Sequence, residues 1–252
     1  MIITIKDKSL CENCMNKTCS FVDAVVKHDF FDIRTETTVC PAGVLLDGPD
    51  LDTDSISEND SCVHCGICVK SCSRQNINGS IMEGEECDYS KMTEPQLNAI
   101  AGTYLNRILG FAANTNRNKA MTFNGYAVHR SGLRMFVEVD WNNDSLECTR
   151  RLLGDFLTNP STVDIKTGIV ILQDLPKRGT HDVLDMLEKL KAFPTTTDVH
   201  IYFSTFNMLR LLYLSLDNYD YSMDEIFHNP LTGSPDGYIS HIKRICRAKK
   251  NT

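Results

Sequence analysis

The sequence predicts a protein of two domains. A small cysteine-rich domain covers residues 1–92, and an α/β layered domain, with helices flanking a mixed sheet, covers residues 93–252. The first observation is that eight of the 11 cysteines precede residue 73. The second is charge, because residues 1–92 hold 8 basic and 16 acidic side chains whereas the rest of the chain is nearly neutral. The third is the alternation of helical and strand patterns after residue 92.

Composition excludes several classes of protein. With 42% hydrophobic and 23% charged residues, the chain of 252 residues is globular rather than disordered. No apolar run approaches the roughly 18 residues that a membrane span needs, so we expect no membrane span. The first residues do not combine a charged segment with a long apolar one, so we expect a cytoplasmic protein without a signal peptide. An odd number of cysteines in such a protein favours metal ligation over disulfides.

The most specific motif is C-x2-C-x2-C-x3-C, which is formed by Cys62, Cys65, Cys68 and Cys72. Three thiolates spaced in this way on a tight loop can bind three irons of one cubane, and the fourth cysteine then reaches another cluster. Gly66 suits such a loop because a Cβ would crowd the backbone against the cluster. Zinc is the main alternative metal for thiolates, although its sites usually draw on two separated cysteine pairs.

An earlier segment repeats this arrangement. Cys11 and Cys14 form a C-x2-C pair, Cys19 follows after four residues, and Cys40 comes later, directly before a proline. Both halves begin with an aspartate shortly before the first cysteine and end with a cysteine followed by a turn residue. An internal repeat of this kind predicts two related cluster sites.

These motifs resemble the bacterial two-[4Fe–4S] ferredoxin family over residues 1 to about 80. The resemblance implies an α+β ferredoxin-like fold that binds two [4Fe–4S] clusters with crossed ligation. It assigns the first cluster to Cys11, Cys14, Cys19 and Cys72, and the second to Cys62, Cys65, Cys68 and Cys40. The longer spacing before Cys19, and Ser73 in place of the family's proline, depart from the pattern. One cluster with a thiolate zinc site therefore stays an alternative.

Other residues of the first domain have two interpretations each. Apolar pairs recur at helical spacing within residues 20–39, which predicts a helix that either shields the first cluster or docks a partner. His64, between two ligands, is either an exposed loop residue or a group that couples proton transfer to electron transfer. The remaining cysteines lack ligand spacing, and we expect small buried side chains or free thiols at Cys87, Cys148 and Cys246.

Local patterns predict the elements of the second domain in chain order. Thr93 and Pro95 mark a helix start, and one apolar face extends that helix over residues 94–113. Alternating strands joined by a hairpin turn are followed by short apolar runs that indicate buried parallel strands. The expected strands are residues 122–129, 133–141, 168–173 and 199–205. The further helices are residues 145–157, 180–192 and 207–216, and one that opens with a capping box at 222–225.

Part of this domain is similar to the restriction-endonuclease-like superfamily. That family carries an acidic residue on one strand and Glu-x-Lys on the next, so that carboxylates bind Mg²⁺ and the lysine orients water. Asn124 stands at the first acidic position, Glu138 matches the glutamate, and Asp140 replaces the lysine. One strand of the family's core is also not evident. The resemblance implies a degenerate version of this fold, more consistent with no independent catalytic activity. The alternative is that Glu138 and Asp140 mark a polar strand face.

The sequence contains no nucleotide-binding or hydrolase motif. Basic residues are scattered apart from a cluster at residues 243–250, which suits phosphates, an acidic partner or plain solvent. The expected function is an iron–sulfur electron carrier, or an electron-entry subunit, with a protein redox or assembly partner. The alternative is an iron–sulfur protein with structural or sensory clusters, whose nuclease-like domain acts on or near nucleic acid. A pure assembly subunit is the third interpretation.

Overall fold

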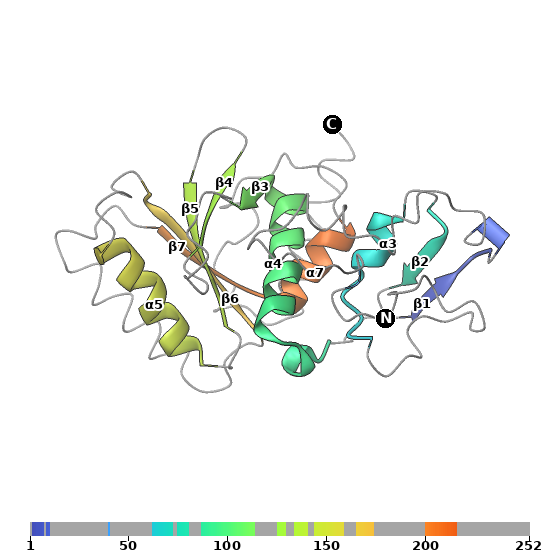
Figure 1. The fold of residues 1–252 in the computed structure, drawn as a ribbon, viewed down its shortest axis with the longest axis horizontal. Coiled ribbons are helices and arrows are strands. Elements are labelled where there is room, and N and C mark those ends of the chain that lie inside the picture. Colours follow the sequence, from blue (N-terminus) through green and yellow to red (C-terminus); the bar gives the residue numbers. More distant parts are fainter. Residues whose placement is uncertain are drawn as a thin grey trace. The chain divides into compact units, whose positions relative to one another are not determined.

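The computed structural model describes residues 2–7, 9–10, 40, 62–72, 75–80, 87–113, 125–129, 134–140, 144–158, 165–173 and 200–215. It divides into two compact units, Met1–Tyr104 and Leu105–Thr252 (Figure 1). No helix of the described ranges is long and apolar enough to cross a bilayer. Several predicted features lie outside the described residues: Cys11, Cys14, Cys19, Asn124, Cys246, the helices at 20–39 and 180–192, the turn at 130–132, the capping box at 222–225 and the basic cluster at 243–250.

The first unit contains a pair of strands that are far apart in the sequence. β1 (Ile2–Ile5) pairs antiparallel with β2 (Ile77–Ser80), so that Ile5 lies opposite Ile77. Beyond the end of β1, Asn76 binds Asp7 twice. Asn76 Nδ2 donates to the Asp7 carbonyl at 2.7 Å, and the Asp7 N–H donates to Asn76 Oδ1 at 3.1 Å. The short helix α3 (Ile67–Ser71) precedes β2. These contacts anchor the C-terminal side of the cysteine motif to the first residues of the chain.

The first unit extends further along the chain than the sequence indicates. It includes the 3-10 helix η2 (Tyr89–Lys91) and most of helix α4 (Glu94–Leu109). We expected a boundary after residue 92, before this helix, whereas the unit ends at Tyr104 within it. The reason is that Tyr104 hydrogen-bonds to residues of the first unit, as described below. The start of α4 follows the prediction, because the Thr93 N–H and hydroxyl both donate to Gln96 Oε1 at 2.9 Å.

The end of α4 differs from the prediction. The helix expected over residues 94–113 ends at Leu109, and Phe111–Ala113 forms strand β3 instead. Gly110 separates the two with φ 68°, a left-handed conformation that glycine adopts without strain, and its N–H donates to the Asn106 carbonyl at 2.8 Å. The apolar character of Phe111–Ala113 continued the helical pattern, so hydrophobicity alone did not reveal the change of element.

The second unit is built on a five-stranded mixed sheet. The strands run in the order β3, β4 (Gly125–His129), β5 (Arg134–Val139), β6 (Thr167–Leu172) and β7 (His200–Thr205). β3, β4 and β5 pair antiparallel, whereas β5, β6 and β7 pair in parallel. The prediction that the two short apolar runs are parallel strands is therefore confirmed. Helix α5 (Ser145–Thr158) lies in the crossover from β5 to β6, as a parallel pair requires, and α7 (Phe206–Ser215) follows β7.

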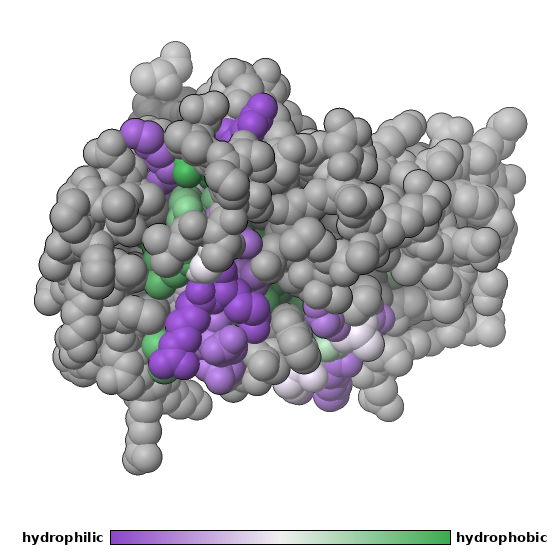
Figure 2. Space-filling model, turned by 60° about the vertical axis from the view of Figure 1, so that its left-hand side comes forward, coloured by the Kyte–Doolittle hydropathy of each residue, from purple (hydrophilic) through white to green (hydrophobic). Residues whose placement is uncertain are grey.

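The core of the second unit lies between α5 and one face of the sheet. Phe136, Val170 and Phe203 come from three successive strands and pack with Cys148 and Leu152 of α5. The opposite face is also buried, because its residues on β5 and β6 are 0–1% exposed: Met135, Val137, Val139, Ile169 and Ile171. The outer side of α5 is polar, and Figure 2 shows hydrophilic residues gathered on the side of the unit that carries this helix. Any polar side chain on the inner face of β5 is consequently enclosed.

Candidate functional site

The cysteine motif forms an irregular loop followed by α3. Residues 62–66 precede the helix, and two of them have left-handed backbone conformations, His64 with φ 56° and Gly66 with φ 77°. Left-handed backbone is uncommon for a residue with a side chain, so His64 marks a tightly constrained turn. Two such residues therefore interrupt any regular backbone geometry between Cys62 and Ile67.

Three sulfur atoms of the motif accept backbone hydrogen bonds. The His64 N–H donates to Cys62, and the Ile67 N–H donates to Cys65. The Asn76 N–H donates to Cys72 Sγ at 3.3 Å. Such donors favour a thiolate and are among the features by which proteins tune iron–sulfur sites.

Cys40 lies near the motif although 21 residues separate it from Cys62 in the sequence. Burial raises the pKa of the Cys62 thiol, and Cys40 raises it further against the opposing hydrogen bond from His64. Burial also raises the pKa of the Cys65 thiol well above its usual value, with added contributions from Cys40 and Cys68. Cys40 therefore lies within electrostatic range of the motif. Together these are the four cysteines that the ferredoxin resemblance assigns to the second cluster.

Among the described residues, no three His, Cys, Asp or Glu side chains converge closely enough to hold one metal ion. Tetrahedral zinc with bonds of about 2.3 Å needs its sulfurs about 3.8 Å apart. A cubane separates its ligand sulfurs further, because each sulfur binds a different iron. Four cysteine thiols are the kind of donor set that a [4Fe–4S] cluster takes. The ligation itself stays a prediction, as do the ligand roles of Cys11, Cys14 and Cys19.

Residues beyond the motif hold its backbone. Tyr104 Oη donates to the Cys65 carbonyl at 2.6 Å, and the hydroxyls of Tyr104 and Tyr89 are 3.3 Å apart. Cys87 Sγ donates to the His64 carbonyl at 3.3 Å. All three of these donors are buried, so the prediction of a small buried side chain at Cys87 is confirmed. Tyr104 was not among the predicted site residues, although it lies four residues after Ile100 on the apolar face of α4.

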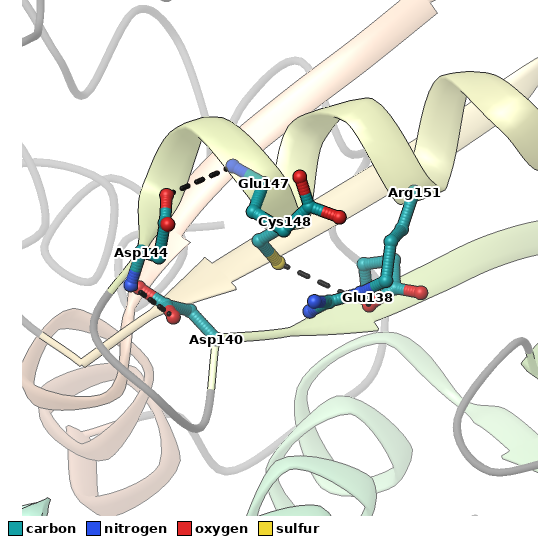
Figure 3. A network of polar contacts seen from close by, with 6 residues as sticks. All are labelled: Glu138, Asp140, Asp144, Glu147, Cys148 and Arg151. Atoms are coloured by element: carbon teal, nitrogen blue, oxygen red, sulfur yellow. Dashed lines mark hydrogen bonds and ion pairs between the residues drawn. The ribbon is translucent and has the colours of Figure 1, made fainter.

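The second unit contains a polar network at the carboxyl end of β5 (Figure 3). Arg151 and Cys148, one turn apart on α5, both point toward Glu138 of β5. Arg151 Nε lies 3.3 Å from Glu138 Oε2, and Cys148 Sγ lies 3.9 Å from the same oxygen. Glu138 is fully buried, whereas the Arg151 side chain is 25% exposed. The network is therefore an ion pair whose carboxylate lies in the core and whose cation reaches the surface.

The pKa shifts in this network follow from the difference in burial between Glu138 and Arg151. Burial lowers the pKa of Arg151, but Glu138, Cys148 and Glu147 together outweigh burial, so that the pKa lies above its usual value. Burial raises the pKa of the Cys148 thiol well above its usual value, and the Glu138 and Asp140 carboxylates raise it further. Cys148 is thus a protonated, fully buried thiol, as one of its two interpretations predicted.

Asp140 stabilises the turn before α5 by accepting a backbone hydrogen bond. Asp140 Oδ1 accepts from the Asp144 N–H at 2.9 Å, and Asp144 Oδ1 accepts from the Glu147 N–H at 3.0 Å. Asp144 is therefore the N-cap of α5, with Glu147 as its third helical residue. The carboxylate of Asp140 stabilises the turn that leads from the sheet into the helix.

The interpretation that Glu138 and Asp140 mark a polar strand face is wrong about the character of that face. Alternation does point both side chains to one face, but they are 0% and 1% exposed. The reason is that α5 covers this face, and Glu138 lies opposite Val170 in a row of core residues. A helical period does predict the partner, because Arg151 lies three residues after Cys148 and both side chains point toward Glu138 (Figure 3).

No protein family matches the chain, and no curated protein or solved structure shows significant similarity to it.

Proposed function

We propose that this protein binds two [4Fe–4S] clusters and acts as an electron carrier or as the electron-entry subunit of a larger complex. The observation that carries the proposal is the proximity of Cys40 to Cys62 and Cys65, because the ferredoxin resemblance requires these distant cysteines to share one cluster. Cys68 would complete that set. Cys11, Cys14, Cys19 and Cys72 would hold the other cluster.

The local environment of these cysteines suits that role. Backbone donors to Cys62, Cys65 and Cys72 would offset thiolate charge, and the burial of Cys65 and Cys68 limits access of water. When bound, the clusters would supply one-electron transfer. The acidic character of residues 1–92 would steer the domain toward a basic surface on a protein partner.

The direct test is metal analysis of protein purified without oxygen. We expect about eight irons and eight sulfides per chain, and electron paramagnetic resonance of the reduced protein should show two interacting clusters. About one or two tightly bound zinc ions with little sulfide would refute the proposal and favour the zinc alternative.

Variants test the assignment of ligands. Cys65→Ala and Cys40→Ala should each remove about half of the iron and the same spectral component, since both would ligate one cubane. Cys148→Ala is the matched control, because Cys148 is equally enclosed but lies in the second unit. Equal loss of iron from Cys148→Ala, or loss of different components from Cys40→Ala and Cys65→Ala, would contradict the assignment.

One observation favours a second candidate function for the C-terminal unit. One strand of the nuclease family's core was not evident in the sequence. The structure contains an additional strand, β3, which pairs with β4. The unit would then bind nucleic acid, with structural or sensory clusters in the first unit. Efficient Mg²⁺-dependent cleavage is not expected, because Glu138 is enclosed and paired with Arg151. Cleavage of DNA or RNA with Mg²⁺ or Mn²⁺ that disappears in Glu138→Ala would reverse this expectation.

A further inference from the structure

The loop that would hold the second cluster depends on hydrogen bonds from outside the motif. Two of its residues, His64 and Gly66, have left-handed backbone conformations. From outside the motif, Tyr104 Oη donates to the Cys65 carbonyl at 2.6 Å and Cys87 Sγ donates to the His64 carbonyl at 3.3 Å. Cys65 is 7% exposed and Tyr104 is fully buried, so water does not readily replace this donor.

The hydroxyl protons of the two tyrosines can be assigned from their partners. A carbonyl oxygen only accepts, so the single hydroxyl proton of Tyr104 is directed to Cys65. The bond between the two phenols at 3.3 Å must then use the proton of Tyr89. The result is a directed chain from Tyr89 through Tyr104 to Cys65, in which the first bond polarises the second.

Tyr104 is also placed rigidly. It lies in the middle of α4, between Ile100 and Ile108, which are both fully buried. The position of its phenol therefore follows the helix rather than the loop. A phenol is protonated at neutral pH, so the Tyr104 hydroxyl is a donor there.

We propose that Tyr104 is a positioning residue for the second cluster, whose phenol fixes the peptide of the ligand Cys65 and offsets the negative end of its carbonyl dipole. This inference rests on the proposed function. If Cys65 is a ligand, its carbonyl oxygen would lie close to the cluster in sequence and would disfavour the added electron. The hydrogen bond from the Tyr104 hydroxyl reduces this effect of the carbonyl. The hydrogen bond from Tyr89 to Tyr104 strengthens the bond that Tyr104 donates.

The experiment compares Tyr104→Phe with wild-type protein purified without oxygen, in potentiometric titrations and in iron release to a chelator. The variant keeps the ring and loses one oxygen. We expect the potential of one cluster to become more negative while the other is unchanged, and iron of that cluster to leave about tenfold faster. Tyr89→Phe should give a smaller shift in the same direction. Tyr213→Phe is the control. It removes the hydroxyl of a buried tyrosine in the second unit and should change neither potential.

Each outcome decides the inference. A shift confined to one cluster, graded from Tyr104→Phe to Tyr89→Phe, supports it. Tyr104→Gln keeps a hydrogen-bond donor, and recovery of the potential in that variant would also support it. Unchanged potentials, equal shifts of both clusters, or lowered stability without a shift in potential would overturn it. If Tyr104→Phe fails to fold, the potential of the cluster in Tyr89→Phe tests the inference instead. Wild-type protein with two clusters but no response to these variants refutes only this inference, whereas wild-type protein without iron and sulfide refutes the proposed function as well.

Discussion

Replacement of Arg151 by methionine tests the ion pair in the second unit. Arg151 Nε lies 3.3 Å from the fully buried carboxylate of Glu138. Methionine preserves most of the aliphatic stem and removes the guanidinium. The Glu138 carboxylate would then remain in the core without its cation, next to apolar residues such as Val170.

The expected cost follows from the burial of each partner. Removal of one partner from a buried ion pair destabilises by about 3–5 kcal/mol, whereas an exposed pair contributes about 0–1 kcal/mol. Glu138 is 0% exposed and Arg151 is 25% exposed, so we expect the lower end of the first range, about 3 kcal/mol. With a urea dependence of about 2 kcal/mol per molar, the unfolding midpoint should fall by about 1.5 M.

The assay is urea unfolding followed by fluorescence. Trp141 is the one tryptophan of the chain and belongs to the second unit, so its emission reports on that unit. Arg150→Met is the matched control. Arg150 is the residue before Arg151, and its side chain is 62% exposed. Arg150 Nη1 lies 3.9 Å from Glu147 Oε2. This control should change stability by no more than about 0.5 kcal/mol.

A second variant separates charge from packing. Glu138→Gln/Arg151→Met removes both charges of the pair, so stability should recover by at least about 1 kcal/mol relative to Arg151→Met alone. Equal midpoints for Arg151→Met and Arg150→Met, or a double variant less stable than Arg151→Met, would refute the view that an uncompensated carboxylate dominates the cost.

The remaining predictions concern the same core. Gly168→Ala should destabilise the second unit by about 1–3 kcal/mol, because its Cβ would lie 3.0 Å from both Leu152 Cδ2 and Phe156 Cε2. Gly154→Ala in α5, with no atom within 4 Å of the added Cβ, should stabilise it by about 0.5–1 kcal/mol. A urea midpoint that rises in Gly168→Ala would contradict the first prediction, and one that falls in Gly154→Ala would contradict the second. Cys148 should react with iodoacetamide only through unfolding, and rapid alkylation of the native protein, read by peptide mass, would disprove this. Because the pKa of Cys148 is raised in the folded state, its contribution to stability is complete below the ordinary value of 9.0 and is lost as pH rises above it. Cys148→Ala should therefore lose less stability than wild type above pH 9.0, as measured by urea unfolding.

Features that depend on near neighbours in the chain were predictable from the sequence. The spacing of Cys62, Cys65 and Cys68, and the helical period of residues 145–157, are properties of short segments, and so are the apolar runs that form β6 and β7. The error at the end of α4 arose because Gly110 is one residue in an otherwise continuous apolar pattern. Its effect on backbone conformation outweighed the hydrophobic period.

Features that join distant segments were decided by the tertiary structure. The sequence by itself determined the cysteine motif and the carboxylates of β5, but not what surrounds them. Cys40 lies near the motif, and Tyr104 reaches the Cys65 carbonyl, because of how the chain folds between them. Glu138 is buried because the crossover from β5 to β6 lays α5 over one face of the sheet and directs Arg151 toward it. Strand register and helix placement set such contacts, and local residue patterns constrain them only weakly.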